Sequence, residues 1–216
     1  MTIAAPSFSL FEAALTPAER QWIARLDAPL AIQQFLDSIP YSAEPVYRCP
    51  LTVLRDRKAH CFDGAVFAAA MLARAGERPL IVDMLPENDD DHVLAVFQRQ
   101  GCWGAIAKSN FVVLRYREPV YRSLRELIMS YFDVFYNLAR QKTLRGYTLP
   151  LNLARFDRLH WLTEDAAMDK IADGLDTVRK IQVVAPSQIE ALSLVEERLS
   201  QAGLVGSDPA GLYQPE

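Results

Sequence analysis

The spacing of hydrophobic and polar positions is helical near both ends of the chain and extended in the middle. Residues 16–19 (TPAE) have the form of a capping box, and apolar positions recur at helical spacing directly after them. These apolar positions are Trp22, Ile23 and Leu26. A second helix is expected over residues 29–39, where Pro40 ends it, and the proline-punctuated stretch 41–58 is expected to be irregular.

The middle of the chain combines one fully apolar segment with three short extended segments. Residues 61–76 (CFDGAVFAAAMLARAG) are apolar on nearly every side, which predicts a helix buried in the middle of a domain and capped by Gly76. Residues 79–85 (PLIVDML) predict a buried strand. Residues 92–98 and 102–108 predict two adjacent antiparallel strands joined by a short turn.

Helical patterns return in the second half of the chain. Apolar positions at helical spacing predict helices over residues 119–140 and 164–180, and residues 187–190 (SQIE) have the form of a capping box for a last helix. The tail 203–216 is expected to be mobile or draped on the surface. Because the predicted strands and helices are segregated along the chain, the fold class is expected to be α+β rather than doubly wound α/β.

A length of 216 residues predicts one domain with a sizeable core. We expect this domain to span residues 1–202, with its core at about 41–116 and helical additions at 16–40 and 118–202. The tail 203–216 lies outside it.

The composition excludes several classes of protein. Half of the residues are hydrophobic, 23% are charged and the formal net charge is -4, which excludes a disordered chain and gives no basic footprint for nucleic acid or an anionic membrane. Residues 1–15 lack a basic region and include Glu12, which argues against a secretory signal. The three cysteines cannot all pair, so at least one thiol is free and a cytoplasmic protein is expected.

Cys61 is the first candidate for chemistry, because it is expected in the first turn of the buried helix. The free N–H groups and the dipole of a helix N-terminus favour negative charge, so the pKa of a thiol there is expected to fall. Asp63 opposes this effect from the same turn, and the upstream Arg55, Arg57 and Lys58 could compensate.

His92 is the second candidate, because it opens a strand expected beside that helix. A cysteine at a helix end that faces a histidine on a neighbouring strand is the general plan of a thiol–imidazole nucleophile pair. Such a pair also needs a third group that orients the imidazole.

Short motifs around both candidates resemble the transglutaminase-like superfamily. They are residues 57–65 (RKAHCFDGA) before an alanine-rich helix, residues 91–96 (DHVLAV) on a strand, and Trp103 on the next strand. The resemblance covers roughly residues 45–112, and its motifs are short and degenerate. It implies a papain-like α+β core, with cysteine at the start of the central helix, histidine on one strand and aspartate on the next.

The resemblance implies roles for individual residues. Cys61 matches the nucleophile, His92 matches the general base, and Trp103 is expected in the substrate-binding site. The third position departs from the family pattern, because no carboxylate occurs between Asp91 and Glu118. Asn110 or Ser109 is expected to accept the imidazole N–H instead. The backbone N–H of Cys61 is the expected first oxyanion-hole donor, with the second donor unassigned.

The expected function is therefore a cysteine hydrolase or acyltransferase that acts on an amide or peptide bond, with the acyl group passed to water or to an amine. The alternative is a transglutaminase-like fold without catalysis that serves as a protein-binding or scaffolding module. No cofactor or metal is expected, because the chain lacks a glycine-rich phosphate loop and the CxxC or HExxH spacings of zinc ligands.

The remaining candidates have simpler interpretations. Cys49 and Cys102 are expected to be structural. His60 is expected to point to solvent or to cap the helix, and His160 to be packed or hydrogen-bonded rather than catalytic. The acidic loop 87–91 (ENDDD) is expected to be solvated beside the site, where it would repel acidic substrates. The arginines at 115, 117, 122 and 125 are expected on a solvated helix face, with a carboxylate or phosphate partner as the alternative, and the aromatic stripe of that helix is compatible with a homodimer.

Overall fold

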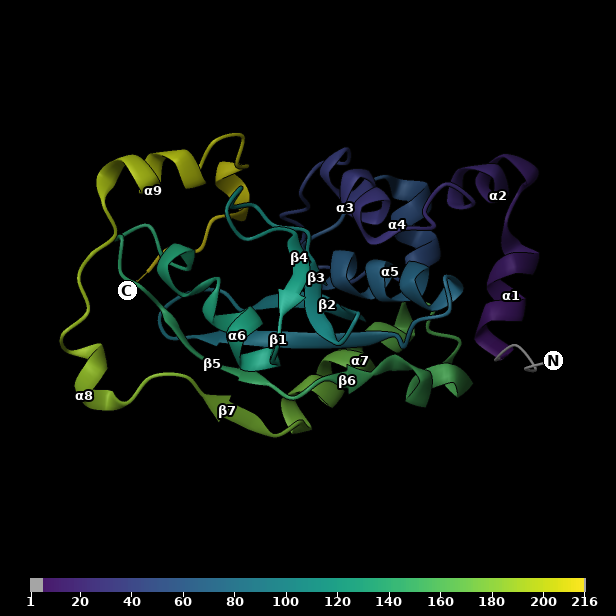
Figure 1. Cartoon of the computed structure of the whole chain (residues 1–216). Helices are drawn as coiled ribbons and strands as arrows, with labels where there is room; N and C mark the ends of the chain where they lie inside the picture. Colours follow the sequence, from purple (N-terminus) through teal and green to yellow (C-terminus); the bar gives the residue numbers. More distant parts are fainter. Residues whose placement is uncertain (1–5, 216) are drawn as a thin grey trace.

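One antiparallel sheet organises the chain, as the computed structural model shows for residues 6–215 (Figure 1). Its strands run in the order β4-β3-β2-β1-β5-β7, and β6 pairs with β1 beside β5. The strands are β1 (Leu80–Pro86), β2 (His92–Arg99), β3 (Cys102–Ile106), β4 (Arg117–Tyr121), β5 (Leu144–Thr148), β6 (Leu151–Asn152) and β7 (Lys180–Gln182). The expected α+β class is confirmed.

Helices from the N-terminal third cover one face of this sheet, and α9 lies at the end away from the N-terminus (Figure 1). The α-helices are α1 (Pro6–Ala14), α2 (Pro17–Ile23), α3 (Pro29–Asp37), α4 (Pro50–Asp56), α5 (Cys61–Arg74), α6 (Leu124–Met129), α7 (Ala166–Thr177), α8 (Pro186–Ile189) and α9 (Glu197–Gly203). Three 3-10 helices are η1 (Phe132–Val134), η2 (Leu153–Leu159) and η3 (Pro209–Gly211). No helix within residues 6–215 is long and apolar enough to cross a membrane.

Alternating side chains along the strands divide the interior into two cores, because successive residues point to opposite faces of a sheet. On β2, Val93 and Ala95 belong to the core that holds α5 and α3. Leu94 and Val96 belong to the second core, which holds α6. This parity places the side chain of His92 on the face of Leu94, opposite α5.

The central helix α5 agrees with its prediction. Its residues from Phe62 to Leu72 are buried, and Gly76 follows with a φ of 91°, which a glycine adopts without strain. The N–H of Glu77 donates to the carbonyl of Leu72 at 3.0 Å and closes the helix end. The two predicted strands after it also form, as β2 and β3, around the turn at Gln100 and Gly101.

The helix expected over residues 119–140 is wrong. Arg117–Tyr121 is the edge strand β4, paired with β3, and Val120 on it is 64% exposed. Ser123 then accepts from the N–H of Glu126 and starts the short α6. The apolar side chains of this segment that pack in the second core therefore come from several short elements rather than from one helix. They are Tyr121 on β4, Leu124, Leu127 and Ile128 on α6, and Tyr131 and Phe135 on either side of η1.

The expected arginine-rich helix face is confirmed only in part, because Arg122 and Arg125 are exposed, whereas Arg115 and Arg117 precede the helix and are half-buried. Arg117 lies over the ring of Tyr131 at 3.9 Å and donates to the carbonyl of Val113 at 3.2 Å. Arg125 donates to the carbonyl of Val183. These guanidinium groups hold loops in place rather than forming a ligand cluster.

Smaller predictions also need correction. Residues 41–58 are not irregular throughout, because Pro50 starts α4 at a position where its missing N–H has no cost. The helix expected over 164–180 ends at Thr177, since residues 180–182 form β7. The helix expected after the box at 187–190 is only the four-residue α8, which starts at Pro186.

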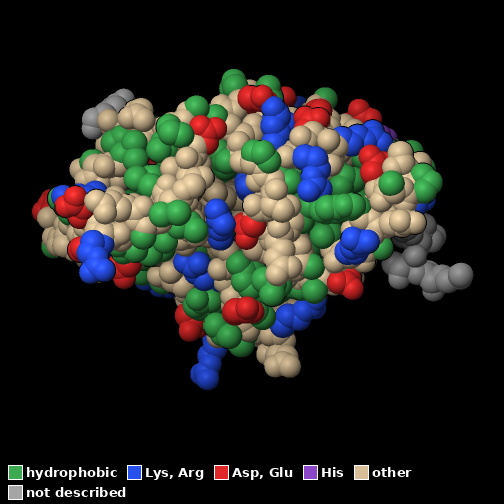
Figure 2. Space-filling view, turned by 90° about the horizontal axis from the view of Figure 1, so that it is seen from above, with side chains coloured by type: hydrophobic (Ala, Val, Ile, Leu, Met, Phe, Trp, Pro, Cys, Tyr) green, Lys and Arg blue, Asp and Glu red, His purple; other side chains and the backbone are tan. Residues whose placement is uncertain are grey.

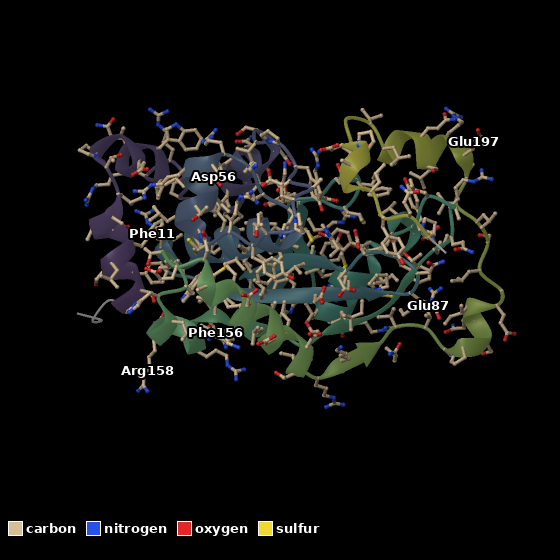
Figure 3. The ribbon with its side chains drawn as sticks, turned by 180° about the vertical axis from the view of Figure 1, so that it is seen from behind. Phe11, Asp56, Glu87, Phe156, Arg158 and Glu197 are labelled. Carbon is tan, nitrogen blue, oxygen red and sulfur yellow. The ribbon has the colours of Figure 1, made fainter. Side chains whose placement is uncertain are left out.

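The outer surface carries both signs of charge. On the face of Figure 2, the coloured Lys and Arg side chains are interspersed with Asp, Glu and apolar side chains. Seen from behind, Phe11 of α1 and Phe156 of η2 mark one end of the molecule, and Glu87 and Glu197 mark the other end (Figure 3). Arg158 projects outward from η2 in this view.

Candidate functional site

The N-terminus of α5 borders a cavity of about 900 Å³. The cavity walls come from residues 41–47, the start of α5, the loop before β2, the start of α7 and the tail residues 210–213. The acidic side chains that line it are Glu44, Asp90, Asp91, Asp165 and Asp169. Among the described residues no Lys or Arg lines it, so the acidic loop lies beside the site as expected and the cavity disfavours acidic ligands.

The first turn of α5 is held by a local network of hydrogen bonds. The ring Nδ1 of His60 accepts from the N–H of Phe62 at 3.2 Å, so His60 caps the helix. The fully buried Asp63 carboxylate accepts from the N–H of Arg48 at 2.8 Å. Burial raises the pKa of Asp63 to about 7. This network fixes the position of Cys61 between His60 and Phe62.

The Cys61 sulfur has one hydrogen-bond acceptor among the described residues, the carbonyl oxygen of Asp91 at 3.7 Å. Burial raises the pKa of the Cys61 thiol to about 12, and the nearby Asp83 and Asp63 raise it further. The N–H of Val93 favours the thiolate but does not offset the burial. The sequence sets the helix N-terminus against Asp63 and leaves the direction of this pKa shift open; in the structure burial decides it, because removal of water disfavours the thiolate.

The imidazole of His92 is oriented by the main chain. Its Nε2 lies 2.8 Å from the carbonyl oxygen of Leu114. A carbonyl can only accept, so Nε2 carries the proton and Nδ1 of the neutral ring presents a lone pair. Among residues 6–215 no hydrogen bond to Nδ1 is formed, and His92 lines a cavity of about 40 Å³ that it shares with Cys61.

The imidazole and the thiol reach this small cavity from opposite faces of the sheet. The ring of His92 lies 6.3 Å from the ring of Phe135 in the second core, whereas Cys61 belongs to the helix on the other face. Both residues are described, and no hydrogen bond joins them. Burial lowers the pKa of His92 to about 4, so the resting pair at neutral pH is an uncharged thiol and an uncharged imidazole.

The predicted orienting contacts from Asn110 and Ser109 are not formed. The Asn110 side chain binds the backbone of Asp208 twice, by a donated bond of 2.9 Å and an accepted bond of 2.8 Å. The hydroxyl of Ser109 accepts from the N–H of Phe111 at 3.0 Å. Both side chains are used in building loops. Asn110 instead holds the tail against the body of the protein, so this part of the tail is docked.

The predicted substrate contact of Trp103 is also wrong. Its side chain packs in the second core, on β3, and it borders neither cavity of Cys61 as the structure describes them. Cys49 is buried, as expected for a structural cysteine, and its sulfur lies 3.3 Å from the hydroxyl oxygen of Thr52. Cys102 is partly exposed at the start of β3 rather than enclosed in the core.

Comparison of the chain with protein-family models and with curated proteins gave no match. No group of three or more His, Cys, Asp or Glu side chains in residues 6–215 is arranged to hold a metal ion.

Three features of the site are not among the residues predicted from the sequence. The Leu114 carbonyl leaves no trace in the sequence, because any residue supplies one. Tyr41 lines both cavities of Cys61 from a stretch expected to be irregular. Asp83 can be recognised in the sequence, because it is a carboxylate inside the buried strand PLIVDML. Burial raises its pKa to about 8, and its Oδ1 is enclosed without a hydrogen-bond partner.

Proposed function

We propose that this protein is a transglutaminase-like cysteine hydrolase or acyltransferase with a papain-like core, acting on an amide or peptide bond. One observation carries the proposal. The Leu114 carbonyl fixes the proton of His92 on Nε2 and leaves the Nδ1 lone pair available on a ring that lines the same cavity as Cys61. The backbone carbonyl takes the orienting role that the family gives to a carboxylate. The acid-lined cavity of about 900 Å³ provides room for a peptide or side-chain amide that is not acidic.

The acylation step uses both groups. The Cys61 S–H proton moves to Nδ1 of His92 while the sulfur bonds to the carbonyl carbon and the carbonyl π electrons move to oxygen. Collapse of this tetrahedral intermediate breaks the C–N bond, and the proton on Nδ1 passes to the leaving nitrogen. The products are a Cys61 thioester and a free amine.

The thioester is cleaved in a second step, in which Nδ1 of His92 again accepts and then returns a proton. Water or a second amine attacks the thioester carbon and gives its proton to Nδ1 of His92. The C–S bond then breaks, and the proton returns from Nδ1 to the Cys61 sulfur. Because the thiol and the imidazole are both uncharged at rest, proton transfer accompanies nucleophilic attack instead of preceding it.

The test is acetylation by p-nitrophenyl acetate, followed by intact-mass spectrometry and peptide mapping. The proposal predicts that wild type gains one acetyl group on Cys61 and that Cys61→Ala gains none there. Cys102→Ser is the matched control, because Cys102 is a partly exposed free thiol outside both cavities. Acetylation that persists in Cys61→Ala but disappears in Cys102→Ser would contradict the proposal.

A protein-binding module without catalysis is the second candidate, favoured by the contact of the Cys61 sulfur with Asp91 instead of His92. In that case Cys61 is a packing residue and its substitution leaves binding and stability nearly unchanged. An unmodified Cys61 in the native wild-type protein, together with a release of p-nitrophenol no faster than in Cys61→Ala, supports this candidate over the enzyme.

A further inference from the structure

We propose that the Tyr41 hydroxyl is the second donor of the oxyanion hole, beside the backbone N–H of Cys61. This inference rests on the proposed acyl transfer, and it assigns a catalytic residue outside the Cys61–His92 pair. Tyr41 is one of the side chains that border both the large and the small cavity next to the thiol.

The backbone of Tyr41 is fixed close to the start of α5. Tyr41 forms a parallel bridge with Ala59, two residues before Cys61. The N–H of Ser42 donates to the carbonyl of Ala59 at 3.0 Å, and the N–H of Ala59 reaches the carbonyl of Pro40 at 3.4 Å. A side chain that leaves this bridge at Tyr41 therefore begins beside the first turn of the helix.

The ring of Tyr41 is held from the other side by the tail. A Cβ atom at Gly211 would lie only 2.9 Å from Cε1 of Tyr41, so the backbone of Gly211 passes directly against the ring. The Asn110 amide fixes that part of the tail through Asp208. With support on both sides, the ring has little freedom to turn away from the cavity.

Tyr41 and Cys61 border the same two cavities, and the backbone N–H of Cys61 is near enough to the phenol to act on the pKa of Tyr41, which it lowers against the larger effect of burial. Burial, more than the acidic neighbours, raises the pKa of Tyr41, so the hydroxyl keeps its proton and remains a donor. The backbone N–H of the nucleophile is a frequent first donor of an oxyanion hole. A substrate carbonyl oxygen placed between these two groups would accept one hydrogen bond from each.

A second tyrosine on the same cavity provides the matched control. Tyr47 lines the large cavity, but its ring packs on Phe62 at 4.8 Å and on His60 at 5.5 Å. It does not border the small cavity of Cys61 and His92 as the structure describes it. Tyr47→Phe and Tyr41→Phe thus each remove a phenolic hydroxyl from a residue of the large cavity, but only Tyr41 also borders the small cavity.

The test compares two reactions of the same sulfur at one pH. Acetylation by p-nitrophenyl acetate passes through an oxyanion, whereas alkylation by iodoacetamide is a direct displacement without one. Tyr41→Phe is expected to slow acetylation of Cys61 by about 10²–10³-fold, the effect of losing one oxyanion donor, and to change alkylation by less than about twofold. Tyr47→Phe, at a residue of the large cavity only, is expected to slow acetylation far less than Tyr41→Phe does.

The other possible results of this experiment distinguish a failure of the Tyr41 inference from a failure of the proposed function. Wild-type acetylation rates in Tyr41→Phe overturn the inference and leave the proposed function intact. An equal loss of both rates also overturns it, because a change in access or folding affects both reactions. If the native wild type is alkylated but never acetylated at Cys61, the proposed function itself fails.

Discussion

The imidazole Nε2 of His92 and the carbonyl oxygen of Leu114 lie 2.8 Å apart, so a main-chain group orients this imidazole. It fixes the tautomer and the direction of the ring, but it brings no negative charge to stabilise an imidazolium. Burial lowers the pKa of His92 to about 4; the bond to Leu114 acts in the opposite direction but does not offset the burial. The site therefore favours a neutral thiol and a neutral base at rest.

The first prediction concerns the reactivity of Cys61 toward iodoacetamide. Burial raises the pKa of this thiol to about 12, so the thiolate fraction grows with pH throughout the accessible range. The alkylation rate is expected to rise about tenfold per pH unit between about pH 7 and pH 10 without a plateau. At pH 7 it is expected to be at least about tenfold slower than that of free cysteine.

Peptide-resolved mass spectrometry over a pH series measures this rate, with Cys102 as an internal comparison in the same protein. A plateau of the Cys61 rate at neutral pH would show a pre-formed thiolate and contradict the burial argument.

The second prediction concerns Asp83 and the pH dependence of stability. Burial raises the pKa of Asp83 to about 8, so the folded protein keeps a proton that the unfolded chain loses above its ordinary pKa near 3.8. The free energy of unfolding therefore falls as the pH rises from about 4 to about 8. Asp83→Asn removes this contribution and is expected to be more stable than wild type at pH 9, by several kcal/mol at about 1.4 kcal/mol per pKa unit.

Urea unfolding of both proteins between pH 5 and pH 9 measures the difference. Asp176→Asn is the control, because Asp176 is a nearby carboxylate whose side chain is 85% exposed. Parallel stability curves for wild type and Asp83→Asn would refute the prediction.

The third prediction concerns Asn110 as the anchor of the tail. Asn110→Ala removes both hydrogen bonds to the backbone of Asp208, at a cost of about 1–3 kcal/mol in the free energy of unfolding. Amide hydrogen exchange of residues 208–213 is expected to accelerate, while exchange in α5 stays slow. Ser109→Ala, which loses only the local bond to Phe111, is expected to leave tail exchange unchanged. Equal tail protection in Asn110→Ala and wild type would show that other contacts hold the tail.

Local signals in the sequence predict the parts of the fold that depend on local chemistry. The predicted capping box between Thr16 and Glu19 is confirmed, and Gly76 ends α5 as expected. The segment 119–140 misleads because β4 at its start exists only through its pairing with β3. A spacing of apolar residues does not show which distant strand will pair with them.

The candidate site likewise contains residues that local sequence patterns predict and residues that only the tertiary fold brings there. Cys61 and His92 are found from the sequence, because each stands at the start of an element with a recognisable pattern. The family resemblance suggests Asn110 or Ser109 as the partner of the imidazole, because they follow Trp103 where the family has an aspartate, but the tail and a local turn occupy their polar atoms. The Leu114 carbonyl and the Tyr41 hydroxyl reach the site through the tertiary fold, which no local pattern records.

The central claim is that His92 acts as the base for Cys61, and the acetylation rate of Cys61 in wild type and in His92→Gln tests it most directly. With the imidazole neutral from about pH 5 upward, the wild-type rate is expected to be nearly flat between about pH 6 and pH 9. His92→Gln is expected to be about 10²–10⁴-fold slower at pH 7, and its rate should rise about tenfold per pH unit as free thiolate takes over. Equal rates and equal pH profiles for the two proteins would contradict the account.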